Sequence, residues 1–269
     1  MLRITNLHCM DDFVSEENKK IDRARVKFVI RRRIRGMAGR RKLGAIWLIL
    51  HPIFLSLVYL FVFTVIRSSP NSENLFIGIC MFNIFSSSIR SGVNSVKDFS
   101  GGIKAERVST RVISQSMLGY RLIDVLLQSL GVSLILFFGL GIGIQGISSF
   151  ILINLSMGII SEGVALNISL LTRRIPDISN FIDYGLLLLF FGSPVLYPLS
   201  ITTGLHYQIN SYNPISYFIE SVRYFSGIEE GFWDLFDTEA IVIILILIAL
   251  SVRGYSTLDK FRWEVSNWS

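Results

Sequence analysis

Residues 19–66 decide how this chain folds, because two stretches of opposite character follow one another there. Residues 19–42 read KKIDRARVKFVIRRRIRGMAGRRK, and residues 47–66 read WLILHPIFLSLVYLFVFTVI. The first stretch is crowded with Lys and Arg, whereas the second is long enough to span a bilayer and has no Lys, Arg, Asp or Glu. A charge at the bilayer centre costs about 2.5–3.5 kcal/mol, so the second stretch predicts a transmembrane helix. The basic stretch before it predicts a cytoplasmic N-terminus.

The basic stretch also carries a helical pattern. Its apolar residues recur at intervals of one, three and four, which places them on one helix face: Val26, Val29, Ile30, Ile34, Met37 and Ala38. Cations occupy the other faces: Lys27, Arg31, Arg32 and Arg35. An amphipathic helix of this kind lies in the headgroup plane with its cations toward anionic lipid. The alternative is a disordered basic tail that only sets the topology.

Six apolar segments are long or apolar enough to cross the membrane. They are Trp47–Ile66, Leu75–Val96, Leu122–Ile144, Phe150–Leu171, Ile182–Tyr197 and Ala240–Val252. The last is short, and we expect it to borrow residues from Phe232 onward. Since 51% of the residues are hydrophobic, more than in most soluble domains, we predict an all-α integral membrane protein with six transmembrane helices.

The distribution of cations between the connections predicts the topology. One set of connections carries most of them: Lys97, Lys104, Arg107, Arg111, Arg121, Arg173, Arg174, Arg253, Lys260 and Arg262. The opposite connections carry only Arg67 and Arg223. The positive-inside rule therefore places both termini in the cytoplasm of a multi-pass protein of the cytoplasmic (plasma or inner) membrane. We expect a tail with an interfacial helix over residues 1–45, a transmembrane domain over 46–253 and a cytoplasmic tail over 254–269, with no cleavable signal peptide.

The region of residues 199–237 is too polar for a spanning helix and too aromatic for a plain loop, and Pro198 and Pro214 interrupt it. Two re-entrant half-helices that enter the membrane from outside, between the fifth and sixth spans, fit this composition, because such backbone survives only where protein or a water-filled cavity satisfies it. An ordinary interfacial aromatic belt is the alternative.

Two ionisable residues, Arg90 and Glu162, stand inside otherwise apolar segments at similar expected depths. We expect them to pair or to face a common hydrated path, unless Arg90 instead extends to the cytoplasmic headgroups. The second span also ends in small polar residues that either line a polar conduit or allow close helix packing: Ser86, Ser87, Ser88, Ser91, Asn94 and Ser95. Gly139, Gly141 and Gly143 suggest either a loose or a close-packed end to the third span, and we expect close packing.

The sequence gives no sign of an active site. It has no phosphate-binding G-x-x-x-x-G-K-[ST] loop, no histidines at metal-ligand spacing and no arrangement typical of nucleophilic catalysis. We therefore expect a chain that is not an enzyme, carries no cofactor or metal, and receives any energy from another chain. The net charge of +6 does not predict nucleic-acid binding, because the cations are separated by membrane side.

Five motifs in order resemble the ABC-2 type permeases that export polysaccharide, from about Lys27 to the end. They are Leu43–Trp47 with His51–Pro52 and Tyr59–Phe63, Phe82–Ser88 with Gly92–Ser95, Arg173–Ile178, Ser193–Pro198, and Asn213–Ile215 with Arg223. The chain departs from the family at Ala105–Ser109, where a Pro is usual, and at Arg90 and His51.

The resemblance implies a complex of two permease copies and two copies of a separate nucleotide-binding ATPase, which would hold ATP and Mg. A coupling loop would dock on that ATPase through Lys97, Asp98, Lys104, Glu106, Arg107 and Arg111. The N-terminal interfacial helix would form a gate for a lipid-linked glycan. Basic residues would attract the lipid pyrophosphate at this entry: Arg31, Arg32, Arg33, Arg35, Arg40, Arg41 and Lys42.

We therefore expect a permease that exports a lipid-linked polysaccharide, such as an O-antigen, capsule or teichoic-acid precursor. Sugar hydroxyls are unfavourable in lipid, so a conduit of aromatic and small polar groups is needed. The candidate path residues are Tyr59, Phe63, Phe82, Phe85, Arg90, Glu162, Phe191 and Tyr197. The alternatives are an ABC-2 permease for a drug or lipid and a membrane scaffold that transports nothing. A partner ATPase separates transporter from scaffold, and neighbouring glycosyltransferase genes separate glycan from drug export.

Overall fold

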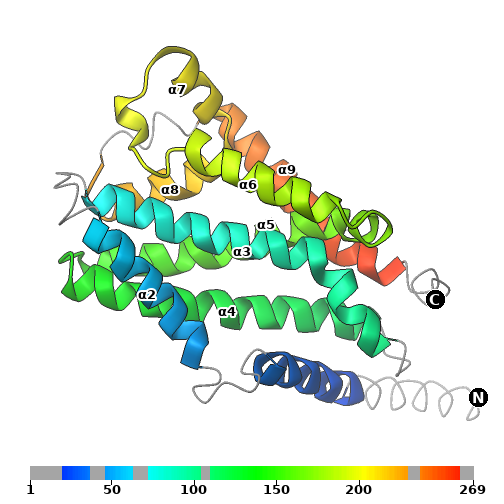
Figure 1. The fold of residues 1–269 in the computed structure, drawn as a ribbon. Coiled ribbons are helices and arrows are strands. Elements are labelled where there is room, and N and C mark those ends of the chain that lie inside the picture. The colour runs from blue at the N-terminus through cyan, green and yellow to red at the C-terminus, as the bar shows by residue number, and fades with distance from the viewer. Residues whose placement is uncertain (1–19, 37–45, 63–71, 104–109, 230–236, 261–269) are drawn as a thin grey trace, which may run out of the picture.

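The computed structural model describes residues 20–36, 46–62, 72–103, 110–229 and 237–260, and within these ranges the chain is helical with no strand (Figure 1). The N-terminal helix covers residues 20–36. The later elements are α2 (Trp47–Phe61), α3 (Ser72–Ile103), α4 (Thr110–Phe138), α5 (Ile144–Arg174), α6 (Ile178–Gly192), the short 3-10 turn η3 (Leu199–Ile201), α7 (Gly204–Ser211), α8 (Pro214–Phe225) and α9 (Thr238–Lys260). The predicted all-α class is confirmed for the described residues.

The helices form one bundle in which α3 and α5 lie side by side (Figure 1). α4 packs on α5, α2 crosses α4, α9 lies along α5, and α6 covers part of α3. α7 and α8 fold together at the end of the bundle where α3 begins. Four helical segments are long and apolar enough to cross a membrane: Glu73–Val96, Val112–Phe138, Ile144–Ser169 and Thr238–Ser256. α6 is apolar but shorter.

The third predicted span is displaced in the structure. α4 begins at Thr110, well before Leu122, and ends at Phe138. The glycines that follow form the turn into α5: Gly141 has φ +68°, and no atom lies within 4 Å of a Cβ at Gly141 or Gly143. Close packing was thus the wrong expectation for these two glycines, because residue 141 needs the backbone freedom of glycine.

The fifth and sixth spans also differ from the sequence prediction. α6 ends at Gly192, since Pro194 cannot donate a helical hydrogen bond and disfavours helical backbone at Ser193, which is extended. Asp237 precedes α9 without being helical, so the last helix gains its length beyond Val252, up to Lys260. α9 begins at Thr238, two residues before Ala240, and the expected extension from Phe232 falls on residues 230–236, outside the described residues.

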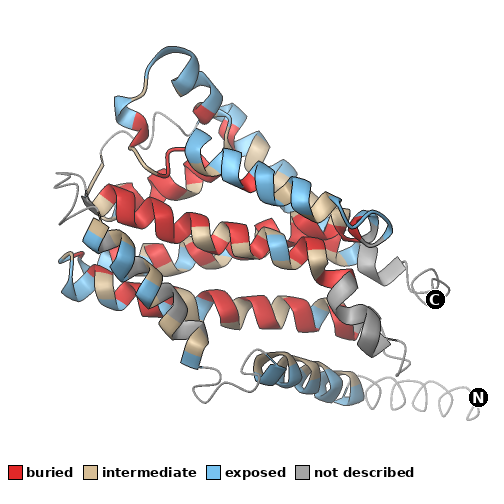
Figure 2. Ribbon diagram, viewed as in Figure 1, coloured by how far each residue is buried: buried red, intermediate tan, exposed pale blue. Residues whose placement is uncertain are grey.

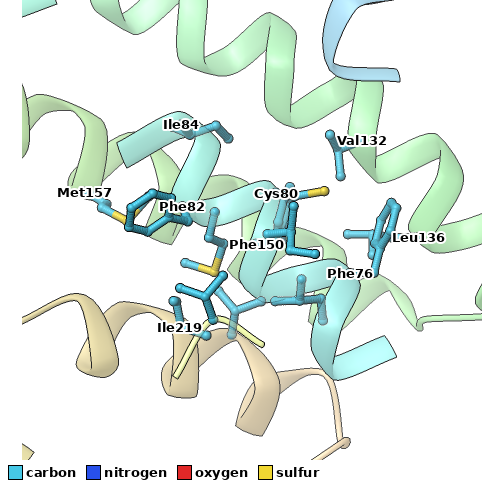
Figure 3. Close-up of a cluster of buried hydrophobic side chains, with 14 of the residues drawn as sticks. Phe76, Cys80, Phe82, Ile84, Val132, Leu136, Phe150, Met157 and Ile219 are labelled. Atoms are coloured by element: carbon cyan, nitrogen blue, oxygen red, sulfur yellow. The ribbon is translucent and has the colours of Figure 1, made fainter. Parts of the chain in front are cut away.

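The hydrophobic core lies where α3, α4, α5 and α8 meet (Figure 3). The side chains shown there come from all four helices: Phe76, Cys80, Phe82, Ile84, Val132, Leu136, Phe150, Met157 and Ile219. A Cβ at Gly78 would lie 2.1 Å from the Val195 carbonyl oxygen, so α3 and the segment after α6 are in backbone contact. This packing fixes α8 and that segment on the end of the bundle.

The burial pattern differs sharply between helices (Figure 2). α3 and α8 are largely buried, whereas α6 exposes most of its length. On the N-terminal helix the covered positions include Val26, Val29, Ile30 and Ile34, and the cations at 27, 31, 32 and 35 are exposed. Residues 20–36 are therefore helical with the predicted apolar face turned inward. Met37 and Ala38 lie outside the described residues.

Candidate functional site

Glu162 of α5 is at the centre of a buried polar cluster, which we call the Glu162 cluster. Its side chain is 0% exposed and accepts three hydrogen bonds from three other helices. The donors are Ser91 Oγ of α3 at 2.8 Å, Arg121 Nη2 of α4 at 3.3 Å and the Tyr255 hydroxyl of α9 at 3.1 Å. Because a buried carboxylate is tolerated only when it is paired and hydrogen-bonded, these contacts tie four helices to one charge.

Arg121 supplies the cation of this cluster. Its side chain is buried and donates from Nη1 to Asp124 Oδ2 at 2.8 Å, and from Nη2 to the Ser87 carbonyl oxygen at 3.4 Å. The sequence prediction placed Arg121 in a cytoplasmic loop, and this is wrong. The charge was read as the end of a span, although Asp124 lies one helical turn further on and can neutralise it.

Arg33 connects the N-terminal helix to the same cluster. Its Nη2 donates to Ser91 Oγ at 3.3 Å, and its guanidinium carbon lies 4.4 Å from the centroid of the Tyr120 ring. Ser91 thus accepts from Arg33 while it donates to Glu162. Nearby, Ile30 Cδ1 lies 2.7 Å from where a Cβ of Gly119 would sit, so only a glycine fits there without a shift. The basic helix is docked on α3 and α4 by an arginine and an isoleucine.

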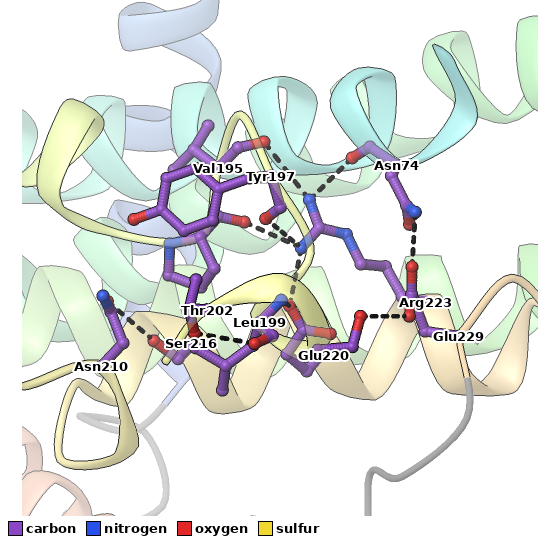
Figure 4. Close-up of polar contacts among 12 residues, drawn as sticks. Asn74, Val195, Tyr197, Leu199, Thr202, Asn210, Ser216, Glu220, Arg223 and Glu229 are labelled. Carbon is purple, nitrogen blue, oxygen red and sulfur yellow. Dashed lines mark hydrogen bonds and ion pairs between the residues drawn. The ribbon is translucent and has the colours of Figure 1, made fainter. Parts of the chain in front are cut away.

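A second buried cluster surrounds Arg223 of α8 and is drawn in Figure 4. We call it the Arg223 cluster. Arg223 is 0% exposed and pairs with Glu220 Oε1 at 2.7 Å. Its other hydrogen bonds go to backbone carbonyl oxygens: Pro194 at 2.8 Å, Tyr197 at 3.1 Å, Val195 at 3.3 Å and Asn74 at 2.8 Å. One guanidinium therefore holds α8, the start of α3 and the segment after α6 together.

Further polar contacts extend this second cluster. Glu220 Oε1 accepts from the Leu199 backbone N–H at 3.2 Å, and Asn74 Nδ2 donates to Glu229 Oε1 at 2.7 Å. Asn213 caps α8 by accepting from the Ile215 N–H, and its Nδ2 donates to Ser193 Oγ at 2.8 Å. Two motifs that the sequence presented separately, residues 193–198 and residues 213–223, are thus one structural unit.

Arg90 and Glu162 have different partners, so the hypothesis that they pair is wrong. Arg90 Nε donates to Asp183 Oδ1 of α6 at 2.7 Å, and both side chains are about half exposed (51% and 52%). Ser91, the neighbour of Arg90 on α3, bonds to Glu162, but Arg121 occupies the place of the cation beside Glu162. Arg90 also has a protein partner, which argues against a side chain that extends only to headgroups.

The predicted path aromatics lie in different environments. Phe82 is 5% exposed and contacts Phe85 and Phe190, so it fills the core of its own chain and offers no open surface; Glu162 is likewise enclosed. Tyr59 and Phe85 are partly buried against the same core. These positions correct the expectation that Phe82 and Glu162 line an open path.

The remaining two described aromatics lie at the end of α6. Phe191 is 61% exposed, and the Tyr197 hydroxyl lies 2.7 Å from His206 Nε2 of α7 and donates to the Gly192 carbonyl oxygen at 3.1 Å. Phe63 lies outside the described residues. These side chains do not converge on one site, and their path role stays a prediction.

The predicted entry and coupling residues are only partly described. Arg31, Arg32 and Arg35 are exposed on the N-terminal helix, while Arg33 turns inward. Arg40, Arg41, Lys42, Lys104, Glu106 and Arg107 lie outside the described residues. For the coupling residues Lys97, Asp98 and Arg111 the structure describes the helices that carry them but not their side chains.

Sequence reasoning missed Asp124, Asp183 and Tyr255 as functional candidates. For Asp124 the signal was present, since it lies three residues after Arg121 on a helix. Asp183 and Tyr255 gave no such signal, because their partners lie 93 residues away along the chain. Such pairs become visible only when α3, α5, α6 and α9 are brought together.

The fold and the two buried clusters define a multi-pass helical membrane protein whose buried charges are compensated by partners on other helices. The sequence model of the family described as "ABC-2 type transporter" matches residues 24–225. The chain belongs to this family.

Two similar proteins, both from Klebsiella pneumoniae, are named O-antigen export system permease protein RfbA. One is 25% identical over 239 residues, which cover 82% of this chain and 86% of the relative. The other is 23% identical over 235 residues, which cover 82% of this chain and 85% of the relative.

Proposed function

We propose that this chain is the membrane permease subunit of an ATP-driven exporter of a lipid-linked polysaccharide. The observation that carries the proposal is the likeness to two O-antigen export permeases along more than four fifths of this chain. Membership of the ABC-2 family supports the transport role. The likeness also covers 86% and 85% of these two relatives, which supports a common architecture rather than a shared fragment.

We propose six spans, formed by α2 to α6 and α9, with both termini in the cytoplasm. The arrangement of charges supports this topology (Figure 1). The N-terminal helix, the C-terminal ends of α5 and α9 and the start of α4 carry Lys or Arg and lie toward one end of the bundle. Glu73 and Glu239 lie in the first turns of α3 and α9, at the ends opposite to the basic ones, and Glu229 follows α8 and accepts a hydrogen bond from Asn74 near the start of α3. By the positive-inside rule the basic end is cytoplasmic.

The segments α7 and α8 lie between the fifth and sixth proposed spans, and we propose that they are the re-entrant half-helices. α8 is short, amphipathic and mostly buried against α3 and α5. The Arg223 guanidinium of α8 satisfies the backbone of the segment 193–198 through three carbonyl oxygens. Irregular backbone at membrane depth needs such internal partners, so the Arg223 cluster supports a re-entrant placement.

Energy would come from a separate ATPase subunit. The sequence has no phosphate-binding loop, and the ABC-2 family supports a partner of this kind. We propose that the connection between α3 and α4 docks on the ATPase at the basic end of the bundle. Two permease copies would then assemble with two ATPase copies, which hold ATP and Mg.

The test is to reconstitute the chain with its partner ATPase in liposomes and to measure ATP hydrolysis with and without lipid-linked glycan. We expect the glycan to stimulate hydrolysis and a deletion strain to lose its surface polysaccharide. No stimulation, together with normal surface polysaccharide, would remove the export proposal.

A second set of cargoes distinguishes the alternatives in the same assay. Stimulation by an amphiphilic drug or a phospholipid, with none by glycan, would indicate an ABC-2 permease for another cargo. Failure of any ATPase to purify with the chain would favour a membrane scaffold instead.

A further inference from the structure

Four polar residues form a stripe along one face of α3: Asn83, Ser87, Arg90 and Asn94. Their spacings of four, three and four residues place them on one helix face about 16 Å long at about 1.5 Å per residue. All four keep some exposure, while Ser88 and Gly92 between them are buried. Gly92 faces α5, since a Cβ there would lie 2.6 Å from the Ala165 Cβ. The stripe is therefore on the side of α3 that α5 does not cover.

The stripe lies inside a segment that is apolar enough to cross the membrane, residues 73–96. Its charge, Arg90, is half exposed and pairs with the half-exposed Asp183 at 2.7 Å. Polar and charged side chains in a span face a protein interior or water, because lipid offers them no partners. A face that stays polar and at least partly exposed over three helical turns is thus unsuited to lipid.

The exposed face of α9 has the opposite chemistry. Between residues 241 and 252 every exposed position is apolar: Ile241, Val242, Leu245, Ile246, Ile248, Ala249 and Val252. α9 therefore meets lipid in the manner of an ordinary span, and the contrast marks the α3 stripe as a surface of another kind.

The stripe has a specific chemical character. Arg90 and Asp183 compensate one another, so the stripe carries no net charge, unlike the cationic N-terminal helix. Asn83 makes no side-chain hydrogen bond within the described part of the chain, and the Asn94 amide bonds only to the Arg90 carbonyl oxygen of its own helix. These groups leave donors and acceptors directed away from the fold.

We propose that the stripe Asn83–Ser87–Arg90–Asn94, with Asp183, is a water-facing binding surface for the neutral, hydroxyl-rich part of the cargo. The inference rests on the proposed export function and deepens it. Amide and hydroxyl groups exchange hydrogen bonds with sugar hydroxyls as they do with water, so a chain can move along the stripe. The Arg90–Asp183 ion pair keeps the surface neutral. The basic N-terminal helix remains the place that would bind the anionic lipid-pyrophosphate end of the cargo.

Cysteine accessibility tests whether the stripe faces water. In the full transporter in membrane vesicles, with Cys9→Ser and Cys80→Ala as background, single cysteines replace Asn83, Ser87 and Asn94. The matched controls are Val242→Cys and Leu245→Cys on α9, which are 49% and 59% exposed. A charged, membrane-impermeant methanethiosulfonate should modify the stripe positions at least tenfold faster than the α9 positions. Added lipid-linked glycan should slow that modification.

Two outcomes overturn the proposal. Equal, slow modification of the α3 and α9 positions would mean that the stripe meets lipid. Protection of the stripe that is independent of glycan, with oxidative cross-linking between two copies, would mean that it is a seam between copies. Both readouts are made without transport, so they remain interpretable even if glycan fails to stimulate the ATPase and the proposed function falls.

The ion pair tests the neutrality of the surface. Asp183→Asn leaves an uncompensated cation and should slow export of a neutral glycan at least threefold, whereas the double variant Arg90→Gln with Asp183→Asn should restore most of the rate. The thermal unfolding temperatures of the same two variants are also compared, and neither should differ much from that of the unchanged protein. A double variant that exports no better than Asp183→Asn would refute the neutrality argument.

Discussion

Arg121 and Arg223 are two fully buried arginines, each paired with a carboxylate three residues away on its own helix. The local carboxylate neutralises the charge, and the guanidinium also bonds to groups on other helices. This is why a hydropathy reading fails at these points: it treats each charge separately, whereas the pair is what enters the core. For Arg121 the result was a span drawn 12 residues too late, from Leu122 in place of Thr110.

Replacement of Arg223 by Gln should destabilise the protein strongly. The change removes the partner of buried Glu220 and most of the donors that the backbone of residues 194–197 uses. Breaking a buried pair on one side costs about 3–5 kcal/mol. Thermal unfolding in detergent measures the loss. Arg90→Gln is the control, because its exposed pair contributes about 0–1 kcal/mol. Similar shifts for the two variants would contradict this account of Arg223.

Arg33→Ala should release the N-terminal helix from the bundle, while Arg32→Ala should not. Arg33 bonds to Ser91 and lies over Tyr120, and a cation over a ring contributes about 0.5–2 kcal/mol, whereas Arg32 is exposed. Spin labels at Phe28 and Leu126, both exposed, report the distance between the helix and α4. We expect a broadened, longer distance distribution for Arg33→Ala alone. An unchanged distribution would show that Ile30 and the other apolar contacts suffice.

At the scale of elements, the sequence predicted which segments are helical better than where they end. The apolar face of the N-terminal helix follows directly from side-chain periodicity, and the span of α3 follows from its hydropathy. The start of α4 was missed because of the buried ion pair of Arg121, and the end of α6 is set by Pro194. The end of α9 depends on its packing against α5. A mean hydropathy over a window of residues does not contain information on such contacts or backbone constraints.

The crossing of α5 and α9 should be sensitive to a single methyl group. A Cβ at Gly254 would lie 1.9 Å from the Gly163 carbonyl oxygen, which is backbone and cannot move aside without shifting a helix. Gly254→Ala should therefore destabilise the protein by about 1–3 kcal/mol, as overpacking does. Gly185→Ala in α6 is the matched control, since no atom lies within 4 Å of its Cβ, and it should be neutral or stabilising. Thermal unfolding of both variants, measured side by side, gives the loss of stability in Gly254→Ala relative to Gly185→Ala.

At the scale of the whole molecule, the polar sites show what a single sequence can and cannot give. Arg90 and Glu162 were identified as unusual because charges in apolar segments are rare. Their partners, Asp183 and Arg121, were not, because nothing local says which helices become neighbours. The region of residues 199–237 was identified as unusual by its composition, yet the role of Arg223 in joining it to the start of α3 needed the fold.

The two ends of α5 provide the sharpest test of the proposed topology. Gly143 caps its start and has open space around its Cβ, and Asp177 is exposed just beyond its end. If cations fix the orientation, Gly143→Cys should react with an impermeant thiol reagent in intact cells, and Asp177→Cys only after permeabilisation. Both variants are made without Cys9 and Cys80. The reversed pattern would place the N-terminal helix outside. Reaction of both from one side would mean that α5 does not cross the membrane, and the six-span arrangement would fall with it.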